Sequence, residues 1–274
     1  MNIIKRAIAT DIEDISLGRV FRAIVKRIME IPHTIAWYLP TKISKDNKSK
    51  LLSYKDKHKG QRCFIIANGP SLKKMDLSLL KNEYAIGMNR IYLLEKVNGF
   101  SPTYLVSNDI NNQLKQFKNE YDVLSNVKFF NWRSRSFFKN QEQLIFFKNR
   151  FSIRFGKDLV NDKIGNGKSV TYSCLHLAYY MGFDTVILIG KDHNYNTNGV
   201  SSIKRIESTG QEDNHFIKGY YLKGMKYGVP DYKGEEMAYL EAKKAFEEDG
   251  RRIYDATVEG KLEVFEKVDY QSFF

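Results

Sequence analysis

From Gln61 onward the chain alternates short apolar runs with longer stretches of helical periodicity. The apolar runs are bounded by turn residues, which is typical of strands buried in a parallel sheet. We predict strands over 62–67, 84–88, 103–107, 127–131, 185–189 and 252–254, and helices over 72–80, 110–124, 168–181 and 235–248. Strands that alternate with helices predict an α/β, Rossmann-like fold: a mostly parallel sheet, right-handed crossovers and helices on both faces.

The first 60 residues follow a different pattern. Apolar residues between Leu17 and Ile31 recur at helical spacing with basic residues between them, and we expect Pro32 to end this amphipathic helix. Such a helix could contact a membrane surface through residues 12–39, or pack on the main domain or on a second copy of the chain. Residues 41–60 are polar and lysine-rich and predict a linker or exposed segment. We therefore divide the chain into 1–60, helix and linker, and 61–274, a Rossmann-like domain.

The strand over 62–67 runs directly into Asn68-Gly69-Pro70-Ser71. Asparagine and glycine tolerate unusual backbone angles, proline presets its own, and Ser71 is placed to cap a helix that begins at Leu72. A strand, a tight turn and a helix N-terminus direct free N–H groups to one point, which suits an anion. The alternative is an ordinary strand-to-helix turn.

Asparagines follow three successive predicted strands, at Asn68, Asn89 and Asn108. The carboxyl ends of parallel strands share one edge of the sheet, and ligands bind beyond that edge. Asparagine offers a donor and an acceptor without charge, although it is also common in turns. Asp192 follows the strand over 185–189 in the same way.

A second stretch, Gly165-Asn166-Gly167-Lys168-Ser169, opens the helix over 168–181. It is not a P-loop, because Asp162 stands where the pattern G-x-x-x-x-G-K-[ST] requires glycine. Ser169 remains a candidate donor at a helix N-terminus.

Residues 193–233 form a long polar, tyrosine-rich stretch without clear periodicity, which predicts a lid-like loop. It contains His215. Histidine has the pKa for general-base work near neutral pH, but a lone histidine is also a common packing residue.

The charge balance favours anionic partners. The chain has 44 Lys and Arg against 32 Asp and Glu, a net charge of +12, which suits nucleotides, acidic sugars, nucleic acid or an anionic membrane. Residues 133–160 interleave basic and aromatic side chains, but they also fit a helix and a strand of the domain, so nucleic acid is the less favoured partner. Cys63 and Cys174 fall in apolar elements and predict buried free thiols, as in a cytoplasmic protein. No run reaches transmembrane length, and no secretory signal is evident.

Four segments in this order resemble a known group: FIIANGPSL, KSVTYSCLHLAYYMGFDTVILIGKDHNY, EDNHF and RRIYDATVEGKLEVFEKVDY. They resemble the family of the archaeal 6-hydroxymethylpterin diphosphokinase, many of whose bacterial members lie in surface-polysaccharide or flagellin-glycosylation systems. They are also similar to the bacterial sialyltransferases of glycosyltransferase family 42, which share a G-N-G-P-S-L loop and an N-S-H-Y segment. Ala67 replaces the first glycine of that loop.

The resemblance implies a role for each matching position. The phosphate and ribose of a cytidine nucleotide would lie against Asn68, Gly69 and Ser71, with Asn89 and Ser169 as further donor contacts. His215, preceded by Asn214, would be the catalytic base. The phosphate-handling tyrosine is displaced by one residue, because Asn194 stands at its place, so this role would fall to Tyr195 or Tyr221. Asn108 and Asp192 complete the predicted substrate-binding set.

The sequence thus predicts a sialyltransferase-like glycosyltransferase that moves an acidic sugar from a CMP-activated donor to a surface glycan or glycoprotein. No D-x-D motif ends a strand, so we expect no cofactor and no metal. One alternative is a diphosphokinase using ATP and Mg²⁺, for which Asp109, Asp192 and Asp213 are the plausible ligands. A second is a non-catalytic module that binds membrane or nucleic acid. The expected location is cytoplasmic, peripheral on the inner face of the membrane, with a homo-oligomer as one option.

Overall fold

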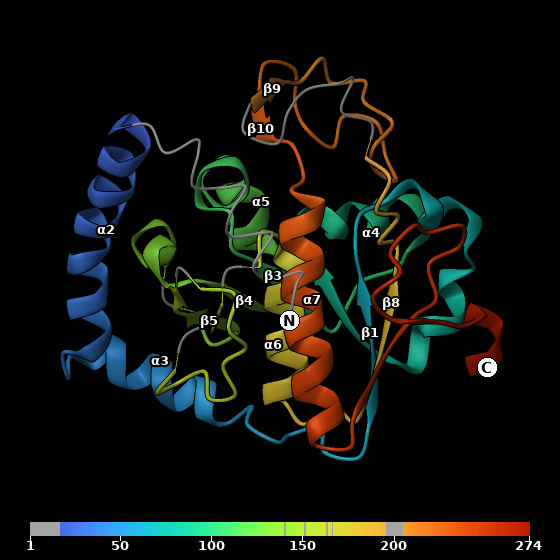
Figure 1. Ribbon diagram of the computed structural model, residues 1–274, viewed down its shortest axis with the longest axis horizontal. Coiled ribbons are helices and arrows are strands. Elements are labelled where there is room, and N and C mark those ends of the chain that lie inside the picture. The colour runs from blue at the N-terminus through green and yellow to red at the C-terminus, as the bar shows by residue number, and fades with distance from the viewer. Residues whose placement is uncertain (1–16, 140, 151, 163, 166, 196–204) are drawn as a thin grey trace. The chain divides into compact units, whose positions relative to one another are not determined.

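The computed structural model describes residues 17–139, 141–150, 152–162, 164–165, 167–195 and 205–274 (Figure 1). They form two compact units, one up to Asp46 and one over Asn47–Phe274. The helices are α2 (Leu17–Tyr38), α3 (Lys42–Leu52), α4 (Leu93–Asn98), α5 (Lys118–Val123), α6 (Val170–Tyr180) and α7 (Tyr232–Glu248). The strands of the main sheet are β1 (Arg62–Ile66), β2 (Tyr84–Met88), β3 (Tyr104–Ser107), β4 (Val127–Asn131), β5 (Leu144–Phe147), β8 (Thr185–Ile189), β11 (Arg252–Asp255) and β12 (Glu266–Lys267).

Shorter elements connect these parts. They are the 3₁₀ helices η1 (Pro70–Lys74), η2 (Leu77–Asn82), η3 (Asn89–Tyr92), η5 (Trp132–Phe137) and η6 (Tyr270–Phe273), the π-helix η4 (Ile110–Leu114), and the small strands β6 (Asn149–Arg150), β7 (Ile164–Gly165), β9 (Arg205–Glu207) and β10 (Lys226–Gly228).

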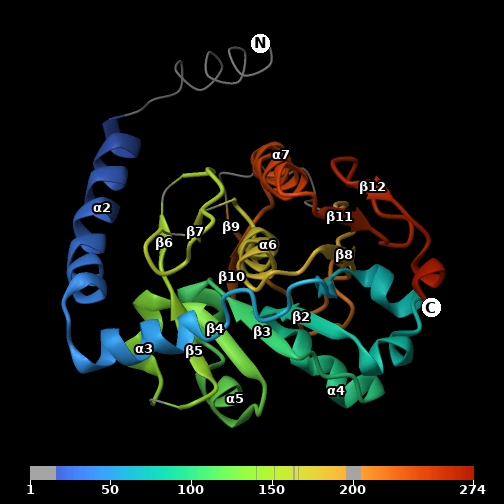
Figure 2. The same ribbon diagram turned by 90° about the horizontal axis from the view of Figure 1, so that it is seen from below.

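The second unit is built on an eight-stranded sheet with the order β12-β11-β8-β1-β2-β3-β4-β5, in which every neighbouring pair is parallel. Helices α6 and α7 cover one face, and α4 and α5 cover the other (Figure 2). The predicted Rossmann-like α/β fold is therefore confirmed. The predicted strands over 84–88, 127–131 and 185–189 have the observed bounds.

The apolar runs form strands because they fill the middle of this sandwich. Residues 63–66 of β1 and 186–189 of β8 are fully buried, which leaves the strands no polar face. Helix α6 lies over β1, β2 and β3, and all residues from Thr171 to Tyr180 are buried. A helix that is buried on every side belongs to the core, so α6 is fixed firmly against the sheet.

Two predicted helices are replaced by shorter turns. The predicted helix over 72–80 is η1 followed by η2, with extended backbone at Met75. The Asp76 side chain accepts a hydrogen bond from Ser78 N at 3.0 Å and so caps the start of η2. Likewise, η4 and α5 replace the predicted helix over 110–124, because Asp109 caps η4 through Asn112 N.

The segment 41–60 is not an exposed linker. It contains α3, and the Asn47 amide exchanges two hydrogen bonds with the backbone of Phe146, at 2.9 and 2.7 Å. Leu51 is fully buried, and His58 stacks on Phe183. The prediction rested on the lysine-rich composition, which does not indicate the few residues that are buried. The two units divide between Asp46 and Asn47 rather than near residue 60.

In the first unit, α2 continues through Pro32 to Tyr38, so proline does not end it as predicted. A proline inside a helix removes one hydrogen bond and bends the helix, and the chain here tolerates that cost. Large apolar side chains of α2 are exposed, among them Phe21, Ile24 and Ile28. None of the helices in the described ranges has the length and apolar character needed to cross a membrane. Contact with a membrane surface stays a prediction.

Candidate functional site

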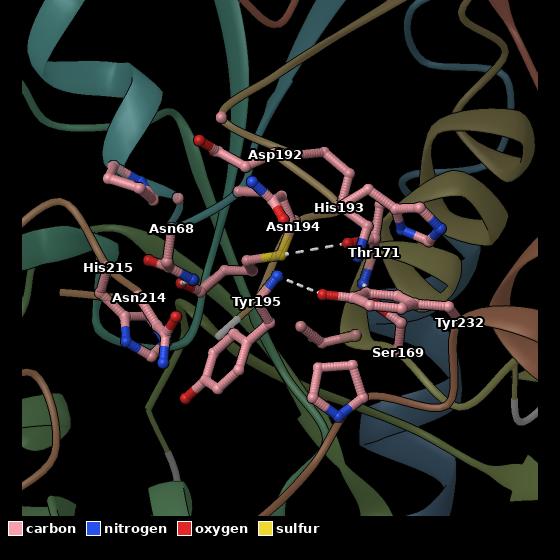
Figure 3. Close-up of a pocket in the computed structure, with 18 residues that line it drawn as sticks. Asn68, Ser169, Thr171, Asp192, His193, Asn194, Tyr195, Asn214, His215 and Tyr232 are labelled. Atoms are coloured by element: carbon pink, nitrogen blue, oxygen red, sulfur yellow. Dashed lines mark hydrogen bonds between the residues drawn. The ribbon is translucent and has the colours of Figure 1, made fainter. Parts of the chain in front are cut away.

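A cavity of about 170 Å³ lies at the carboxyl ends of β1, β2 and β8 (Figure 3). Strand β1 pairs with β2 on one side and with β8 on the other. The strands from β2 to β5 are therefore added on one side of β1, and the later strands β8, β11 and β12 on the other side. In open parallel sheets such a switch point leaves a crevice where ligands bind. The lining residues are Ala67, Asn68, Gly69, Pro70, Met88, Ser169, Val170, Thr171, Gly190, Lys191, Asp192, His193, Asn194, Tyr195, Asn214, His215, Pro230 and Tyr232.

The cavity brings together most of the predicted site residues, although they come from four separate parts of the sequence. On its wall are Asn68, Gly69, Ser169, Asp192, Tyr195, Asn214 and His215. The predicted residues that do not line it are Ser71, Asn89, Asn108 and Tyr221. Figure 3 places Asn68, Asn214 and His215 on one side of the cavity, with Ser169, Thr171 and Tyr232 on the other.

The turn after β1 already holds an anion of the chain itself. The carboxylate of Asp192 accepts hydrogen bonds from the Ser71 N–H at 3.0 Å and from the Ser71 hydroxyl at 2.8 Å. Gly69 N–H donates to Gly190 O at 2.9 Å. Two predictions for Ser71 are therefore wrong: it does not cap a helix from Leu72, and its N–H does not point into an open anion site. Burial raises the pKa of Asp192, and the Ser71 hydrogen bonds oppose that shift.

Asn68 joins the turn to the segment that carries His215. Its side-chain NH₂ donates to Met88 O at 3.1 Å, and its backbone carbonyl accepts from Phe216 N–H at 3.0 Å. The side-chain oxygen of Asn68 is buried on the cavity wall and has no hydrogen-bond partner among the described residues. A buried acceptor without a partner is costly, so this oxygen is suited to a donor group on a ligand.

The other strand-end asparagines have internal partners. Asn89 Oδ1 accepts from the Ser107 hydroxyl at 2.9 Å, and the Asn108 NH₂ donates to Ser173 Oγ at 2.7 Å. Both lie at the predicted edge of the sheet, but these bonds tie neighbouring elements to one another. Asn89 also has left-handed backbone angles, with φ of 50°.

The N-terminus of α6 forms the wall opposite His215. Ser169 is its N-cap, and the Ser169 hydroxyl oxygen accepts from Thr171 N–H at 3.2 Å. The Thr171 hydroxyl donates to the sulfur of Met88 at 3.5 Å. The helix begins two residues later than predicted, but Ser169 lies where the sequence placed it, at a helix N-terminus beside a cavity.

His215 is buried, with 9% of its surface exposed, and it is packed among tyrosines. Its ring stacks on Tyr220 with centroids 3.8 Å apart and an interplanar angle of 5°, and meets Tyr195 and Tyr221 edge-on. Burial lowers the pKa of His215 to about 3, while the charge of Glu212 acts in the opposite direction. Among the described residues its ring nitrogens have no hydrogen-bond partner, so the neutral ring keeps a free lone pair.

Tyr195 and Tyr221 differ in their relation to the cavity. Tyr195 lines it, and its backbone N–H donates to the hydroxyl of Tyr232. Tyr221 stacks on Tyr227 behind that wall, with ring centroids 4.4 Å apart. Of the two tyrosines predicted to handle the phosphate, Tyr195 is therefore the one that a ligand in the cavity could reach.

A cluster next to Asp192 was not predicted. Lys191 Nζ lies 2.7 Å from Glu235 Oε2, and the two side chains are 14% and 5% exposed. His193 has a φ of 53°, a left-handed conformation that costs a non-glycine residue free energy, and its Nε2 lies 2.9 Å from Glu236 Oε1. Burial lowers the pKa of His193. Lys191 and His193 follow the end of β8, so the strand-end rule that selected the asparagines would also have selected them, whereas Glu235 and Glu236 come from α7.

The three acids considered as magnesium ligands do not converge. Asp192 is bound to Ser71, Asp109 caps η4, and the Asp213 side chain is 77% exposed. Within the described ranges, no group of three or more His, Cys, Asp or Glu residues is arranged to hold a metal ion. Metal independence stays a prediction.

Comparison with known proteins gives one family. The family model described as 6-hydroxymethylpterin diphosphokinase MptE-like matches residues 40–198, which is more than half of the chain. No curated protein matches. Among solved structures, the MAf glycosyltransferase from Magnetospirillum magneticum AMB-1 has a TM-score of 0.49 and 15% sequence identity. The match covers 83% of this chain and 38% of that one, and at this level it carries no information on activity.

Proposed function

Since the chain belongs to the 6-hydroxymethylpterin diphosphokinase MptE-like family, we propose that it is a transferase with a nucleotide substrate in the cavity at β1, β2 and β8. More narrowly, we propose a sialyltransferase-like glycosyltransferase. It moves an acidic sugar from a CMP-activated donor to a hydroxyl of a surface glycan or glycoprotein. The observation that carries this proposal is the position of His215, a buried histidine that stacks on Tyr220 and lines the wall of that cavity.

In the proposed reaction the acceptor hydroxyl attacks the anomeric carbon of the donor. The new bond joins the acceptor oxygen to that carbon, and the bond between the carbon and the phosphate oxygen of CMP breaks. His215 takes the hydroxyl proton as general base, and CMP leaves with the electron pair. Asn68 Oδ1 supports donor binding, because a ligand N–H or O–H would supply the hydrogen bond that it lacks.

The negative charge on the departing phosphate needs hydrogen-bond donors. We place it at the N-terminus of α6, an eleven-residue helix whose Ser169, Val170 and Thr171 line the cavity. Tyr195 also lines the cavity, but its ring points away from this wall toward the side of His215 (Figure 3), so its hydroxyl would need to turn to reach the same phosphate. The turn at Ser71 is not used, because Asp192 occupies its N–H group.

The second candidate is the phosphoryl transfer that the family's name describes, a diphosphokinase reaction with ATP and Mg²⁺. The family match favours it directly. Mg²⁺ is usually held by one or two carboxylates together with the phosphates of the substrate. Only Asp192 of the three candidate ligands lies on the cavity wall, and both of its carboxylate oxygens accept hydrogen bonds from Ser71, which favours the glycosyltransferase instead.

The pH dependence of transfer tests the role of His215. The base is active when neutral, and burial lowers its pKa to about 3, so the neutral form persists well below the usual value for histidine. We expect the acid limb of kcat to lie far below pH 6.5, with little change between pH 5 and 7. The measurement is CMP release from a CMP-activated sugar across that range, with the thermal midpoint followed in parallel. An acid limb centred near pH 6.5 would contradict the buried, neutral base.

A thermal-shift panel tests the two enzyme proposals together. The protein is heated with CMP, CTP, UDP, GDP, ATP or AMP, each with Mg²⁺ and with EDTA, because a ligand bound to the native state raises the midpoint. A shift with CMP or CTP that survives EDTA supports the glycosyltransferase. A shift with ATP that requires Mg²⁺ supports the diphosphokinase. No shift with any of the six nucleotides overturns both proposals.

A further inference from the structure

The buried guanidinium of Arg90 joins the sheet edge to the lid-like loop. Arg90 follows β2 and its side chain is 7% exposed. The guanidinium donates to Gly219 O at 3.2 Å, to Tyr220 O at 2.5 Å and to the Tyr92 hydroxyl at 3.3 Å. It also forms an ion pair with Glu120 at 3.3 Å and lies 3.9 Å from the centre of the Phe117 ring. A buried cation with this many partners is firmly held.

The two carbonyls that Arg90 holds belong to the segment that carries His215. The Tyr220 ring lies under the His215 ring at 3.8 Å, and the Tyr220 hydroxyl accepts from the Arg90 backbone N–H at 3.4 Å. At the other end of the segment, Phe216 N–H donates to Asn68 O. His215 is thus held from two strand ends: β1 through Asn68 and β2 through Arg90.

We propose that Arg90 is a positioning residue for His215: by binding the carbonyls of Gly219 and Tyr220, it keeps Tyr220 stacked under the His215 ring and keeps that ring buried at the cavity. The catalytic consequence rests on the proposed function. The structural consequence, the burial of His215, does not depend on any activity.

The chemistry requires arginine. One nitrogen of its planar, forked group reaches two adjacent carbonyls while another reaches Glu120. Lysine keeps the charge but ends in a single ammonium group on a flexible stem, which cannot hold all these acceptors in fixed geometry. The Arg90→Lys variant therefore keeps a buried cation and loosens the loop.

The test is an NMR titration of the five histidines in the wild type and in Arg90→Lys. In the wild type we expect His215 not to titrate between pH 5 and 8. In Arg90→Lys its midpoint should move into this range, toward 6.5, as the ring gains solvent. His58, bound to Gln61 and Tyr104 elsewhere in the domain, reports in the same spectrum that the core is intact. Arg252→Lys, at a side chain that is 64% exposed, is the matched control and should leave His215 unchanged.

Kinetics provide a second readout. If CMP release is measurable, Arg90→Lys should lower kcat by a factor of about 10 to 100, or about 1.4 kcal/mol for each tenfold loss. The KM for the donor should change less, because Arg90 positions the base and does not contact the donor site. Should Arg90→Lys fail to fold, Tyr92→Phe removes only one acceptor of the guanidinium and should move His215 in the same direction by less. An unchanged His215 titration in whichever of these variants folds would overturn the inference, with or without turnover. If the wild-type protein releases no CMP from the donor, only the proposed function is overturned, because the titration of His215 does not depend on turnover.

Discussion

Replacing His215 by alanine is expected to lower kcat for CMP release by a factor of about 10². This is the lower end of the usual contribution of a general base, because a pKa of about 3 makes His215 a weak base near neutral pH. The binding of CMP should change far less, because His215 is assigned to the proton of the acceptor and not to the nucleotide. The measurements are single-turnover CMP release and the thermal shift that CMP produces. The variant also removes a buried ring from the stack with Tyr220, so its own thermal midpoint must be recorded.

The control for this variant is His33→Ala, which removes a histidine of α2 in the first unit. We expect it to keep the wild-type rate. Transfer that persists in His215→Ala within threefold of the wild type would contradict the assignment of the base. Loss of the CMP shift together with the rate would assign His215 to nucleotide binding instead.

Gly69→Ala is expected to lower the free energy of unfolding by about 1–3 kcal/mol, the usual cost of overpacking, and to abolish the nucleotide shift. A Cβ at residue 69 would lie 1.7 Å from Asp192 Oδ2 and 2.6 Å from Gly190 O. The backbone carbonyl cannot rotate away, so β1 and β8 must separate at the cavity or Asp192 must leave Ser71. Glycine is needed here for close approach and not for its backbone angles, since its φ is −72°.

Gly228→Ala is the matched control. Gly228 lies in β10, and a Cβ added there meets no atom within 4 Å. Urea unfolding and the nucleotide panel should give wild-type values for it. A Gly69→Ala protein with wild-type stability and an unchanged nucleotide shift would contradict the tight packing of the turn against Asp192.

The sequence allowed the sheet to be predicted because strand formation here depends on local composition. Residues 63–66 and 186–189 are apolar at every position, and a short apolar run bounded by turn residues is typical of a buried strand. The edge that carries the cavity then follows from the parallel topology, which placed Asn68 and Asp192 there. Ser169 was predicted from its helix N-terminus, and only the family resemblance assigned His215 to the same site.

What the sequence did not reveal depends on pairs of distant residues. Ser71 was expected to face a ligand, but its partner is Asp192, 121 residues later. Asn108 likewise has a partner that is distant in the sequence, because its side-chain NH₂ donates to Ser173. The composition of a single segment cannot indicate such a partner. Arg90 was missed because an isolated arginine after a strand is normally solvated, and only the folded loop supplies the carbonyls that bury it.

The position of β1 between β2 and β8 has a consequence for the order of folding. β2 follows β1 closely in the sequence, whereas the main chain pairs Cys63 with Val186 across more than a hundred residues. Closing such a loop is entropically costly, and parallel sheets with distant pairings fold slowly. During synthesis, β1 to β5 emerge first and leave one edge of β1 open until β8 arrives. The cavity closes only at that late step, so the proposed nucleotide would stabilise the finished fold and could not guide the early stages of its assembly.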